Sequence, residues 1–210
     1  FYYKTFMWPK SFWKKYERVI RRAAGLGVLP TGPDPDRYDK HNAHCDVLVV
    51  GAGPAGLAAA AAAGRTGARV ILADEQSELG GSLLGSRQLI DGAPATQWVA
   101  AMVDELTAME EVRLVPRGAV FGYFDHKFLG ILEGILEAIR EPGLEGGPGH
   151  PLPGAAKGPR ERLWRVRARQ VVNAAGAIER PLVFPDNDRP GIMLASAVSS
   201  YVNRYAVAPG

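Results

Sequence analysis

Short apolar runs alternate with helical patterns along the chain, and this order predicts an α/β fold. Residues 46–50 are apolar after the first position, and the alanine-rich segment 57–63 follows them across a short turn. A second apolar run at 68–73 comes next, and 94–109 repeat the helical periodicity before a third apolar run at 112–115. Short buried strands that alternate with helices are typical of a parallel sheet flanked by helices.

The second half of the chain departs from this alternation. Residues 119–124 predict the first strand of a small antiparallel insertion, whereas 126–140 fit either a strand or a helix. The Gly and Pro content of 141–159 predicts a flexible loop. Alternation at 163–168 predicts a half-exposed strand, and 170–173 is expected to re-enter the main sheet.

Three spaced glycines join the first predicted strand to the first predicted helix. Gly51, Gly53 and Gly56 form the pattern Gly-x-Gly-x-x-Gly in a strand–turn–helix context. Gly51 permits the tight turn, Gly53 lets the backbone approach a pyrophosphate, and Gly56 lets the helix pack closely on the strand. The helix N-terminus adds free N–H groups and the positive end of its dipole. We therefore expect a Rossmann-like FAD/NAD(P)-binding fold, a parallel sheet flanked by helices with a small antiparallel insertion.

Two acidic residues end the second strand and bear on which dinucleotide binds. Asp74 follows the glycine motif at about the sequence spacing expected of the acid that accepts hydrogen bonds from an adenosine ribose. Glu75 is the next residue. A 2′-phosphate would meet both negative charges. The acids therefore favour a non-phosphorylated dinucleotide over NADP.

Two further groups of small residues are candidates for backbone approach to a cofactor. Gly80 and Gly81 precede Ser82, and a loop of this composition can come close to a pyrophosphate. Ala175 and Gly176 follow the last predicted strand and offer a second approach. A glycine-rich turn that binds no ligand is the alternative interpretation of the whole set.

The remaining sequence divides the chain into two parts. Residues 1–9 are aromatic and irregular, and 11–24 predict a short helix with Ser11 as its N-cap. Residues 29–44 have the composition of a linker. We expect an N-terminal part at 1–44 and an incomplete dinucleotide-binding domain at 45–210, with both ends of the chain cut from a longer polypeptide.

Composition and charge exclude several classes of function. The 25 basic and 22 acidic residues leave a net charge of +3, which is too small and too dispersed to indicate nucleic acid binding. Cys45 is the only cysteine, which excludes an internal disulfide and favours a reducing compartment. No apolar run approaches the length of a membrane span, and a signal-peptide pattern is absent from the N-terminus. We expect a soluble, cytoplasmic protein that has no membrane partner.

The sequence offers no catalytic or metal-binding set. His41, His44, His126 and His150 lie in linkers or ambiguous segments, without a carboxylate at the spacing of a triad. Cys45 has neither a second thiol nor a zinc-ligand spacing. Structural or surface roles are the preferred interpretation for these side chains.

Several phrases of the sequence resemble the alpha subunit of the heterotetrameric sarcosine oxidase family. They are residues 1–9 (Phe-Tyr-Tyr-Lys-Thr-Phe-Met-Trp-Pro), 74–76 with the Gly-Gly-Ser-Leu-Leu at 80–84, 176–184 and 187–191. The resemblance covers almost the whole chain and implies an N-terminal fragment of that protein. One departure is Ala175, where the family usually has Thr, so a hydroxyl that could contact the cofactor is missing.

The resemblance implies an enzyme complex that oxidises sarcosine to glycine, formaldehyde and hydrogen peroxide, or to methylene-tetrahydrofolate when tetrahydrofolate is present. The family's FAD and covalent FMN are associated with the beta subunit, and gamma and delta subunits complete the heterotetramer. Folate chemistry belongs to the carboxy-terminal part of alpha. The dinucleotide domain of alpha is implied to hold NAD, and this fragment alone is expected to be inactive.

The same resemblance implies roles for individual residues. Ala55 would be a backbone donor at the helix start, and Ser82 a hydroxyl near the pyrophosphate. Val120 would be a main-chain partner of the adenine. Asp74, Glu75 and Gln76 would surround the adenosine ribose.

Two other functions stay open at this point. The first is an FAD-binding, electron-transferring subunit of an opine or amino-acid dehydrogenase, because the same glycine and acid pattern serves FAD and NAD. The second is a non-catalytic scaffold with an empty site.

Overall fold

The computed structural model describes residues 9–25, 32–33, 36–135 and 158–208, which fall into two units, Phe1–Pro35 and Asp36–Gly210. In the first unit a 3-10 turn, η1 (Lys10–Phe12), leads into helix α2 (Trp13–Ala23). The predicted helix is therefore confirmed. Ser11 as its N-cap is wrong, because Ser11 lies inside η1 and the N-cap residue is Phe12, whose side chain makes no capping hydrogen bond. The aromatic residues 1–8 lie outside the described residues.

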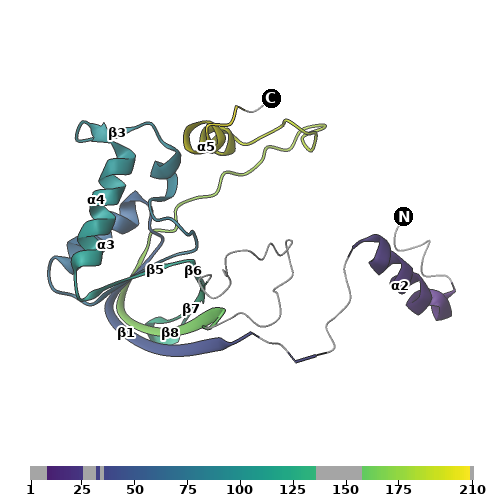
Figure 1. Cartoon of the computed structure of the whole chain (residues 1–210), viewed down its shortest axis with the longest axis horizontal. Helices are drawn as coiled ribbons and strands as arrows, with labels where there is room; N and C mark the ends of the chain where they lie inside the picture. The colour runs from purple at the N-terminus through teal and green to yellow at the C-terminus, as the bar shows by residue number, and fades with distance from the viewer. Residues whose placement is uncertain (1–8, 26–31, 34–35, 136–157, 209–210) are drawn as a thin grey trace. The chain divides into compact units, whose positions relative to one another are not determined.

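The second unit is built on a six-stranded mixed sheet (Figure 1). Its strand order is β5-β2-β1-β8-β7-β6. Neighbours among β5, β2, β1 and β8 pair in parallel, and β7 pairs antiparallel with both β8 and β6. The strands are β1 (Tyr38–Val50), β2 (Val70–Asp74), β5 (Val112–Pro116), β6 (Gly118–Phe124), β7 (Phe128–Gly134) and β8 (Glu161–Asn173). The predicted parallel sheet and its antiparallel insertion are both confirmed.

Two strand predictions need correction. The predicted linker is wrong over 38–44, because these residues form the first half of β1. The two strands predicted at 163–168 and 170–173 are one continuous strand, β8. Pairing between β1 and β8 runs in one register from Tyr38 and Glu161 to Val50 and Asn173. Each strand therefore satisfies the other's backbone groups over a length that neither sequence pattern indicates alone.

The ambiguous segment 126–140 is resolved as far as it is described. Residues 125–127 form the 3-10 turn η3 (Asp125–Lys127), and β7 follows it. Residues 136–140 and most of the predicted flexible loop at 141–159 lie outside the described residues.

Helices α3 (Pro54–Gly64) and α4 (Ala95–Ala108) lie side by side against one face of the sheet (Figure 1). Alternation along the strands decides which residues face them, because successive side chains point to opposite faces. Val49 and Leu72 pack with Leu57 of α3 and Leu106 of α4. The neighbouring strand positions, such as Leu48, belong to a second core on the other face. Burial on both faces explains the continuous apolar runs of β1 and β2.

The second core is formed by strand residues alone. It joins residues of β1, β2 and β5 to residues of β7 and β8, namely Cys45, Leu48, Ile71, Ala73, Val115, Leu129, Ile131, Trp164, Val166 and Ala168. Cys45 is 2% exposed, and its burial raises the pKa of the thiol to about 11. The thiol is therefore protonated at neutral pH and behaves as a small apolar side chain.

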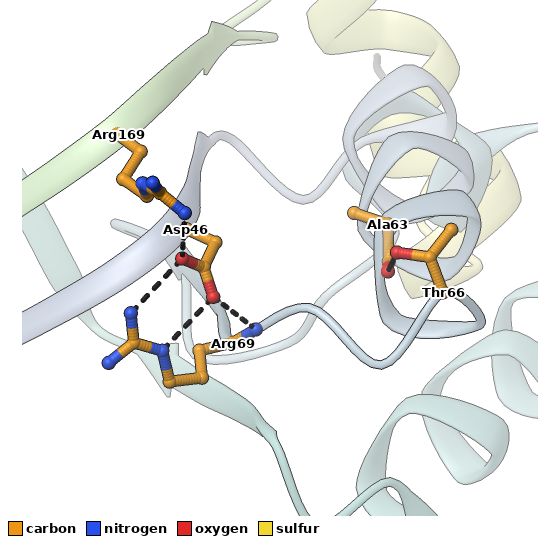
Figure 2. A network of polar contacts seen from close by, with 5 residues as sticks. All are labelled: Asp46, Ala63, Thr66, Arg69 and Arg169. Carbon is orange, nitrogen blue, oxygen red and sulfur yellow. Dashed lines mark hydrogen bonds and ion pairs between the residues drawn. The ribbon is translucent and has the colours of Figure 1, made fainter.

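A charged network fixes the start of β2 beside β1 (Figure 2). The Asp46 carboxylate accepts hydrogen bonds from the backbone N–H of Arg69 at 3.1 Å and from its guanidinium at 3.0 Å. Arg169 of β8 adds an ion pair at 3.6 Å. These bonds, the Arg69 side chain first, hold the pKa of Asp46 well below its usual range. Figure 2 also shows the hydroxyl of Thr66, which donates to the carbonyl of Ala63 at 2.7 Å near the end of α3.

The last helix, α5 (Ala195–Tyr205), lies beside the 3-10 turn η2 (Gly81–Gly85). The side-chain amide of Asn203 donates to the carbonyl of Gly85 at 3.0 Å, and Arg204 pairs with Glu78. A short hairpin, β3 (Leu89–Ile90) and β4 (Ala93–Pro94), connects η2 to α4.

Candidate functional site

A cleft of about 590 Å³ lies at the carboxyl ends of β1, β2 and β8. Ligands of open α/β sheets bind outside the carboxyl ends of the strands, so the position of the cleft fits a cofactor site. Of the cofactor-binding residues that the sequence predicts, all line this cleft except Gly56 and Gly80. The predicted residues that line it are Gly51, Gly53, Ala55, Asp74, Glu75, Gln76, Gly81, Ser82, Val120, Ala175 and Gly176.

Packing explains two of the three motif glycines. Gly51 has φ +95°, and a Cβ there would lie 2.4 Å from the carbonyl oxygen of Ala174. A Cβ on Gly56 would lie 1.8 Å from the carbonyl oxygen of Gly51. The fold itself therefore requires glycine at both positions, and Gly56 acts by letting α3 approach the turn.

Gly53 is different, because a Cβ there would have no neighbour within 4 Å. Its backbone has φ −69° and ψ −175°, which any residue adopts. Gly53 lines the cleft, so the added atom would enter it. A glycine that neither packing nor backbone geometry requires, at the edge of a cleft, fits close approach of a ligand.

Backbone hydrogen bonds bring the small-residue segments of the site together. The amide of Gly51 donates to the carbonyl of Ala73 at 2.8 Å, and the amide of Ala174 donates to the carbonyl of Val50 at 2.7 Å. The amide of Gly80 donates to the carbonyl of Ala52, between the first two motif glycines, at 2.8 Å. These bonds hold the glycine turn between the end of β8 and the loop that carries Gly81 and Ser82.

The N-terminus of α3 is arranged to receive an anion. Gly53 is the N-cap, Pro54 occupies the first turn, and no side chain caps the helix. The first intrahelical bond of this turn runs from the amide of Leu57 to the carbonyl of Gly53 at 2.9 Å. The amide of Ala55 therefore belongs to the set of helix-start N–H groups that lack an intrahelical partner. With the helix dipole, these groups favour a phosphate.

The carboxylate of Asp74 is bonded inside the protein. Its Oδ2 accepts a hydrogen bond from the amide of Ala52 at 2.5 Å, and its Oδ1 accepts one from the amide of Gln76 at 2.8 Å. Glu75 is exposed, and the side-chain amide of Gln76 lies 3.4 Å from its Oε1. The two acids at the end of β2 therefore have different surroundings.

The rest of the lining is small and uncharged. Ala119 and Val120 of β6 and Ile178 after β8 provide apolar surface, and Gly176 has φ +73°. The amide of Ala175 donates to Oδ1 of Asn173 at 3.3 Å. Among the described residues that line the cleft, Asp74 and Glu75 are the charged ones, so no basic side chain of the lining could pair with a 2′-phosphate.

Sequence reasoning missed several lining residues, namely Val50, Pro54, Ala73, Gly118, Ala119, Ala174, Ala177 and Ile178. The run of small residues before Gly176 was a sufficient indication for Ala174. Gly118 has no comparable indication, because its closeness to Ile131 depends on the pairing of β6 with β7.

A second cleft of about 590 Å³ lies at the opposite ends of the strands, and His44, Cys45, Arg69 and Arg113 are among its lining. None of the predicted cofactor residues lies there. Arg69 is already paired with Asp46, and the Cys45 thiol is buried and protonated, so neither residue offers a free charge or a thiolate to this cleft.

The described histidines form no catalytic set. His41 packs edge-on against Trp164, with 5.0 Å between ring centroids, and its Nε2 lies 3.8 Å from Asp39. His126 is in η3, and His150 lies outside the described residues. Where the structure describes the chain, no three His, Cys, Asp or Glu side chains are grouped to hold a metal ion. The described helices are too short or too polar to cross a membrane.

The chain is similar to known proteins along most of its length. The family model described as "FAD dependent oxidoreductase" matches residues 46–170, which is more than half of the chain. The alpha chain of sarcosine oxidase from Rhizobium meliloti (strain 1021) is 52% identical over 211 residues, covering 100% of this chain and 20% of that protein. An opine oxidase chain of Agrobacterium tumefaciens (strain Ach5) is 30% identical over 160 residues, covering 72% of this chain and 28% of that protein. The chain thus spans between a fifth and a third of the length of these relatives.

A solved structure supports the fold. The L-proline dehydrogenase of P. horikoshii aligns with a TM-score of 0.60 and 22% sequence identity, covering 88% of this chain and 32% of that one. At this identity the likeness concerns the arrangement of the strands and helices. It is consistent with the predicted Rossmann-like FAD/NAD(P)-binding fold.

Proposed function

Because the chain belongs to the FAD dependent oxidoreductase family, we propose that residues 45–210 are the dinucleotide-binding domain of the alpha subunit of a sarcosine oxidase complex. In this proposal the cleft at the ends of β1, β2 and β8 binds the adenosine diphosphate end of the dinucleotide. The relative at 52% identity supports the choice of complex. The open space beside Gly53 is the observation that supports the site.

The residues present fit such a ligand. The amide of Ala55 and the α3 dipole would hold the pyrophosphate, with Gly53 and Gly81 allowing the backbone to approach it. The hydroxyl of Ser82 would add a donor on the other side. Asp74, Glu75 and Gln76 would surround the ribose, and the main chain of Val120 would contact the adenine. All of these residues line the same cleft, which supports their assignment to one ligand.

The proposed occupant is NAD, with FAD as the alternative. The resemblance to the alpha chain of sarcosine oxidase supports NAD, whereas the family model supports FAD. The described cleft residues would contact the adenosine diphosphate part, which NAD and FAD have in common. A bound flavin would supply redox chemistry, and a bound NAD of this kind would be held without turnover; in both cases the chain's own residues bind and orient the adenosine end.

The remaining parts of the proposal lie beyond this chain. We propose that the complex oxidises sarcosine with molecular oxygen, which is reduced to hydrogen peroxide. The other products are glycine and either formaldehyde, which takes its oxygen from water, or methylene-tetrahydrofolate when tetrahydrofolate accepts the one-carbon unit. The FAD and FMN of the complex, its tetrahydrofolate site and its beta, gamma and delta subunits would be contributed by other segments and chains. The proposed domain boundary near residue 45 falls inside β1, and Asp36 is the alternative start that the division into two units supports.

Extraction of the native protein followed by mass analysis tests the occupant. We expect one NAD for each alpha chain, and FAD and FMN in amounts that match the beta subunit. Absorbance at about 450 nm in the separated alpha chain would instead indicate flavin in this cleft, because of the two dinucleotides only the flavin absorbs at that wavelength. A cleft that yields neither dinucleotide would support the scaffold alternative.

A second candidate function is an FAD-binding subunit of an opine oxidase or dehydrogenase. The opine oxidase relative at 30% identity supports it. Turnover by the native complex separates the two, since sarcosine and an opine such as octopine can be compared directly as substrates. Turnover of the opine alone would favour the second candidate.

A further inference from the structure

The first halves of β1 and β8 run side by side beyond the part of the sheet that α3 and α4 cover (Figure 1). The helices pack on Val47, Val49 and Val172, in the second halves of the two strands. In the first halves, Cys45 and Trp164 belong to the second core. Because successive side chains of a strand point to opposite faces, the residues between the members of that core point away from it. We call this side of the strands, with the neighbouring residues of β6 and β7, the basic face. Its exposed side chains include Lys40, His44, Arg165, Arg167, Phe121 and Phe124.

Two arginines in the middle of the basic face have no acid beside them. The residues in register with Arg165 are Asn42 of β1 and Gly130 of β7. The residue of β1 in register with Arg167 is His44. Within the described part of the chain, neither guanidinium forms an ion pair. Two like charges this close on one face repel each other, so an anion that binds between them would be stabilised by both.

The acids of the same strands lie elsewhere. Asp39 and Glu133 are in register with Arg162 and form ion pairs with it at 3.6 and 3.3 Å, on the opposite side of the strands. Asp46 and Glu161 lie at the two ends of the basic face. Asp46 is also bonded within the charged network at the start of β2. The middle of the basic face therefore carries positive charge that the described residues do not balance.

Large apolar side chains border the two arginines. Phe121 of β6 is 60% exposed and lies over Gly130, where an added Cβ would be 2.4 Å from its ring. Phe124 is 52% exposed, and its ring centre lies 5.9 Å from that of Phe128. The guanidinium of Arg167 lies 5.6 Å from the centre of the Phe128 ring. Arginine and aromatic residues are enriched in protein–protein interfaces, so the composition of the basic face is that of a docking surface.

We propose that the basic face binds an acidic surface of another subunit of the complex. Carboxylates of that surface pair with Arg165 and Arg167, because planar guanidinium groups suit bidentate pairing with a carboxylate. Apolar side chains around these carboxylates cover Phe121 and Phe124. The inference rests on the proposed function, because it requires an assembled complex. Relatives at 52% and 30% identity are both named as subunits, which supports such an assembly.

The extent of the charge favours a protein over nucleic acid as the partner. A nucleic acid is bound by a basic stripe that follows many phosphates. The cations of the basic face that lack an ion pair within the described residues are Lys40, Arg165 and Arg167. Exposed phenylalanines lie beside them rather than further basic residues. A few carboxylates set in an apolar surface match this combination of charge and apolar area.

Zero-length cross-linking of the native complex with a carbodiimide tests the partner. The reagent joins a lysine amine to a carboxylate when the two are in contact. Lys40 is exposed on the basic face, which makes it the reporter. We expect mass analysis of the digested complex to find Lys40 joined to an Asp or Glu of another subunit. Lys40 joined only within its own chain, only to a second copy of that chain, or to no carboxylate would overturn the inference.

Competition for assembly measures the contribution of the arginines. Full-length Arg165→Glu and unmodified alpha chains with different tags are expressed together with limiting amounts of the other subunits. We expect the variant to enter the complex at about one tenth of the unmodified level or less, because repulsion replaces an attractive charge pair. Arg87→Glu changes an exposed arginine between η2 and β3, away from the basic face. This matched control should enter at the unmodified level.

Dinucleotide content separates this inference from the proposed cofactor site. Neither Arg165 nor Arg87 lines the dinucleotide cleft, so both variant chains should keep the bound dinucleotide of the unmodified chain. An Arg165→Glu chain that keeps its dinucleotide and enters the complex normally would overturn the inference and leave the cofactor site intact. A native complex that contains no dinucleotide in the alpha chain would contradict the cofactor site alone.

The remaining outcomes are also decisive. If Arg165→Glu does not fold, Lys40→Glu provides the same comparison, because this side chain is exposed on β1. Normal assembly of the variant together with weaker retention on immobilised DNA would assign the basic face to nucleic acid and overturn the inference. A native protein that purifies without other subunits would contradict the proposed complex, and the docking surface with it.

Discussion

At the scale of single residues, the three motif glycines serve two different purposes. Gly51 and Gly56 are required by the protein, because a Cβ at either position would collide with backbone atoms. Gly53 is not required by any protein neighbour. The structure therefore separates glycines that make the turn from the glycine that leaves room beside it, a distinction that the sequence motif does not express.

We expect Gly53→Val to abolish bound dinucleotide while the protein remains folded, because its side chain would occupy the space proposed for the pyrophosphate. The free energy of unfolding should change by less than about 1 kcal/mol, since a Cβ at this position would have no neighbour within 4 Å. Extraction with mass analysis measures the dinucleotide, and thermal unfolding measures stability. Normal dinucleotide content in the folded variant would contradict the assignment.

Gly51→Ala is the matched control. Its φ of +95° costs a non-glycine residue about 1–3 kcal/mol, and its Cβ would also collide with Ala174. This variant should therefore lose stability as well as dinucleotide, which separates a packing glycine from one that makes room for a ligand.

The acids Asp74 and Glu75 also predict cofactor selectivity. The native protein should bind NAD at least about tenfold more tightly than NADP, because a 2′-phosphate meets negative charge and no basic residue among the described cleft residues. Asp74→Ala should weaken the binding of NAD and reduce the ratio between the affinities for NAD and NADP. Competition titrations measure both affinities, and equal affinity of the unmodified protein for NAD and NADP would be incompatible with this interpretation of the cleft.

At the scale of elements, the junction of β1, β2 and β8 depends on one carboxylate. Asp46 accepts hydrogen bonds from Arg69 and forms an ion pair with Arg169 (Figure 2). These contacts lower the pKa of Asp46 in the folded protein relative to its ordinary value of 3.8. A carboxylate whose pKa is lower in the folded than in the unfolded protein stabilises the fold when the pH is above the unfolded-state pKa. This stabilisation is lost as the pH falls toward and through the folded-state pKa.

We therefore expect Asp46→Asn to lower the Tm at neutral pH and to flatten the loss of stability below about pH 4, where the unmodified carboxylate takes up a proton. Thermal unfolding between neutral pH and the lowest pH at which the protein stays soluble measures both effects. Asp104→Asn, which removes an exposed acid from α4, is the control. An unchanged acid-side slope in Asp46→Asn would show that this network does not govern the pH dependence.

At the scale of the whole molecule, the lining of the cleft decides what the described residues offer to a ligand. The cleft contains backbone donors, two acids and small apolar residues, and the described histidines lie outside it. Large apolar residues are also exposed after β8; Val183 is 97% exposed and Ile178 is 92% exposed. Exposed apolar residues of this kind mark surfaces that bind other protein segments.

We expect the isolated 210-residue chain to release no hydrogen peroxide from sarcosine, with or without added FAD and NAD, because a binding site without a positioned acid, base or flavin does not lower a barrier. A coupled peroxidase assay measures the release, with the native complex as the positive control. Steady turnover above the buffer blank would require a catalytic site that the described residues do not reveal.

Much of the fold could be predicted from the sequence because its causes are local. The glycine spacing dictates the turn through steric contacts within a few residues, and the apolar runs of β1 and β2 follow from burial on both faces of a parallel sheet. The helices α3 and α4 begin and end within a residue or a few residues of the expected positions. The same local rules brought Gly51, Asp74 and Gly176 to one cleft, since the carboxyl ends of the parallel strands β1, β2 and β8 meet at one edge of the sheet.

Tertiary structure decided what depends on partners distant in the sequence. Residues 38–44 have the composition of a linker, yet they form a strand because β8 supplies their backbone partners across more than a hundred residues. Ser11 is a good N-cap by type, but the 3-10 turn moves the helix start past it. Asp74 and Glu75 are adjacent acids in the sequence, and the structure distinguishes them because the backbone amides of Ala52 and Gln76 both donate to Asp74. Backbone hydrogen-bonding groups must find partners wherever the fold brings them, so pairing over long sequence separations overrides composition.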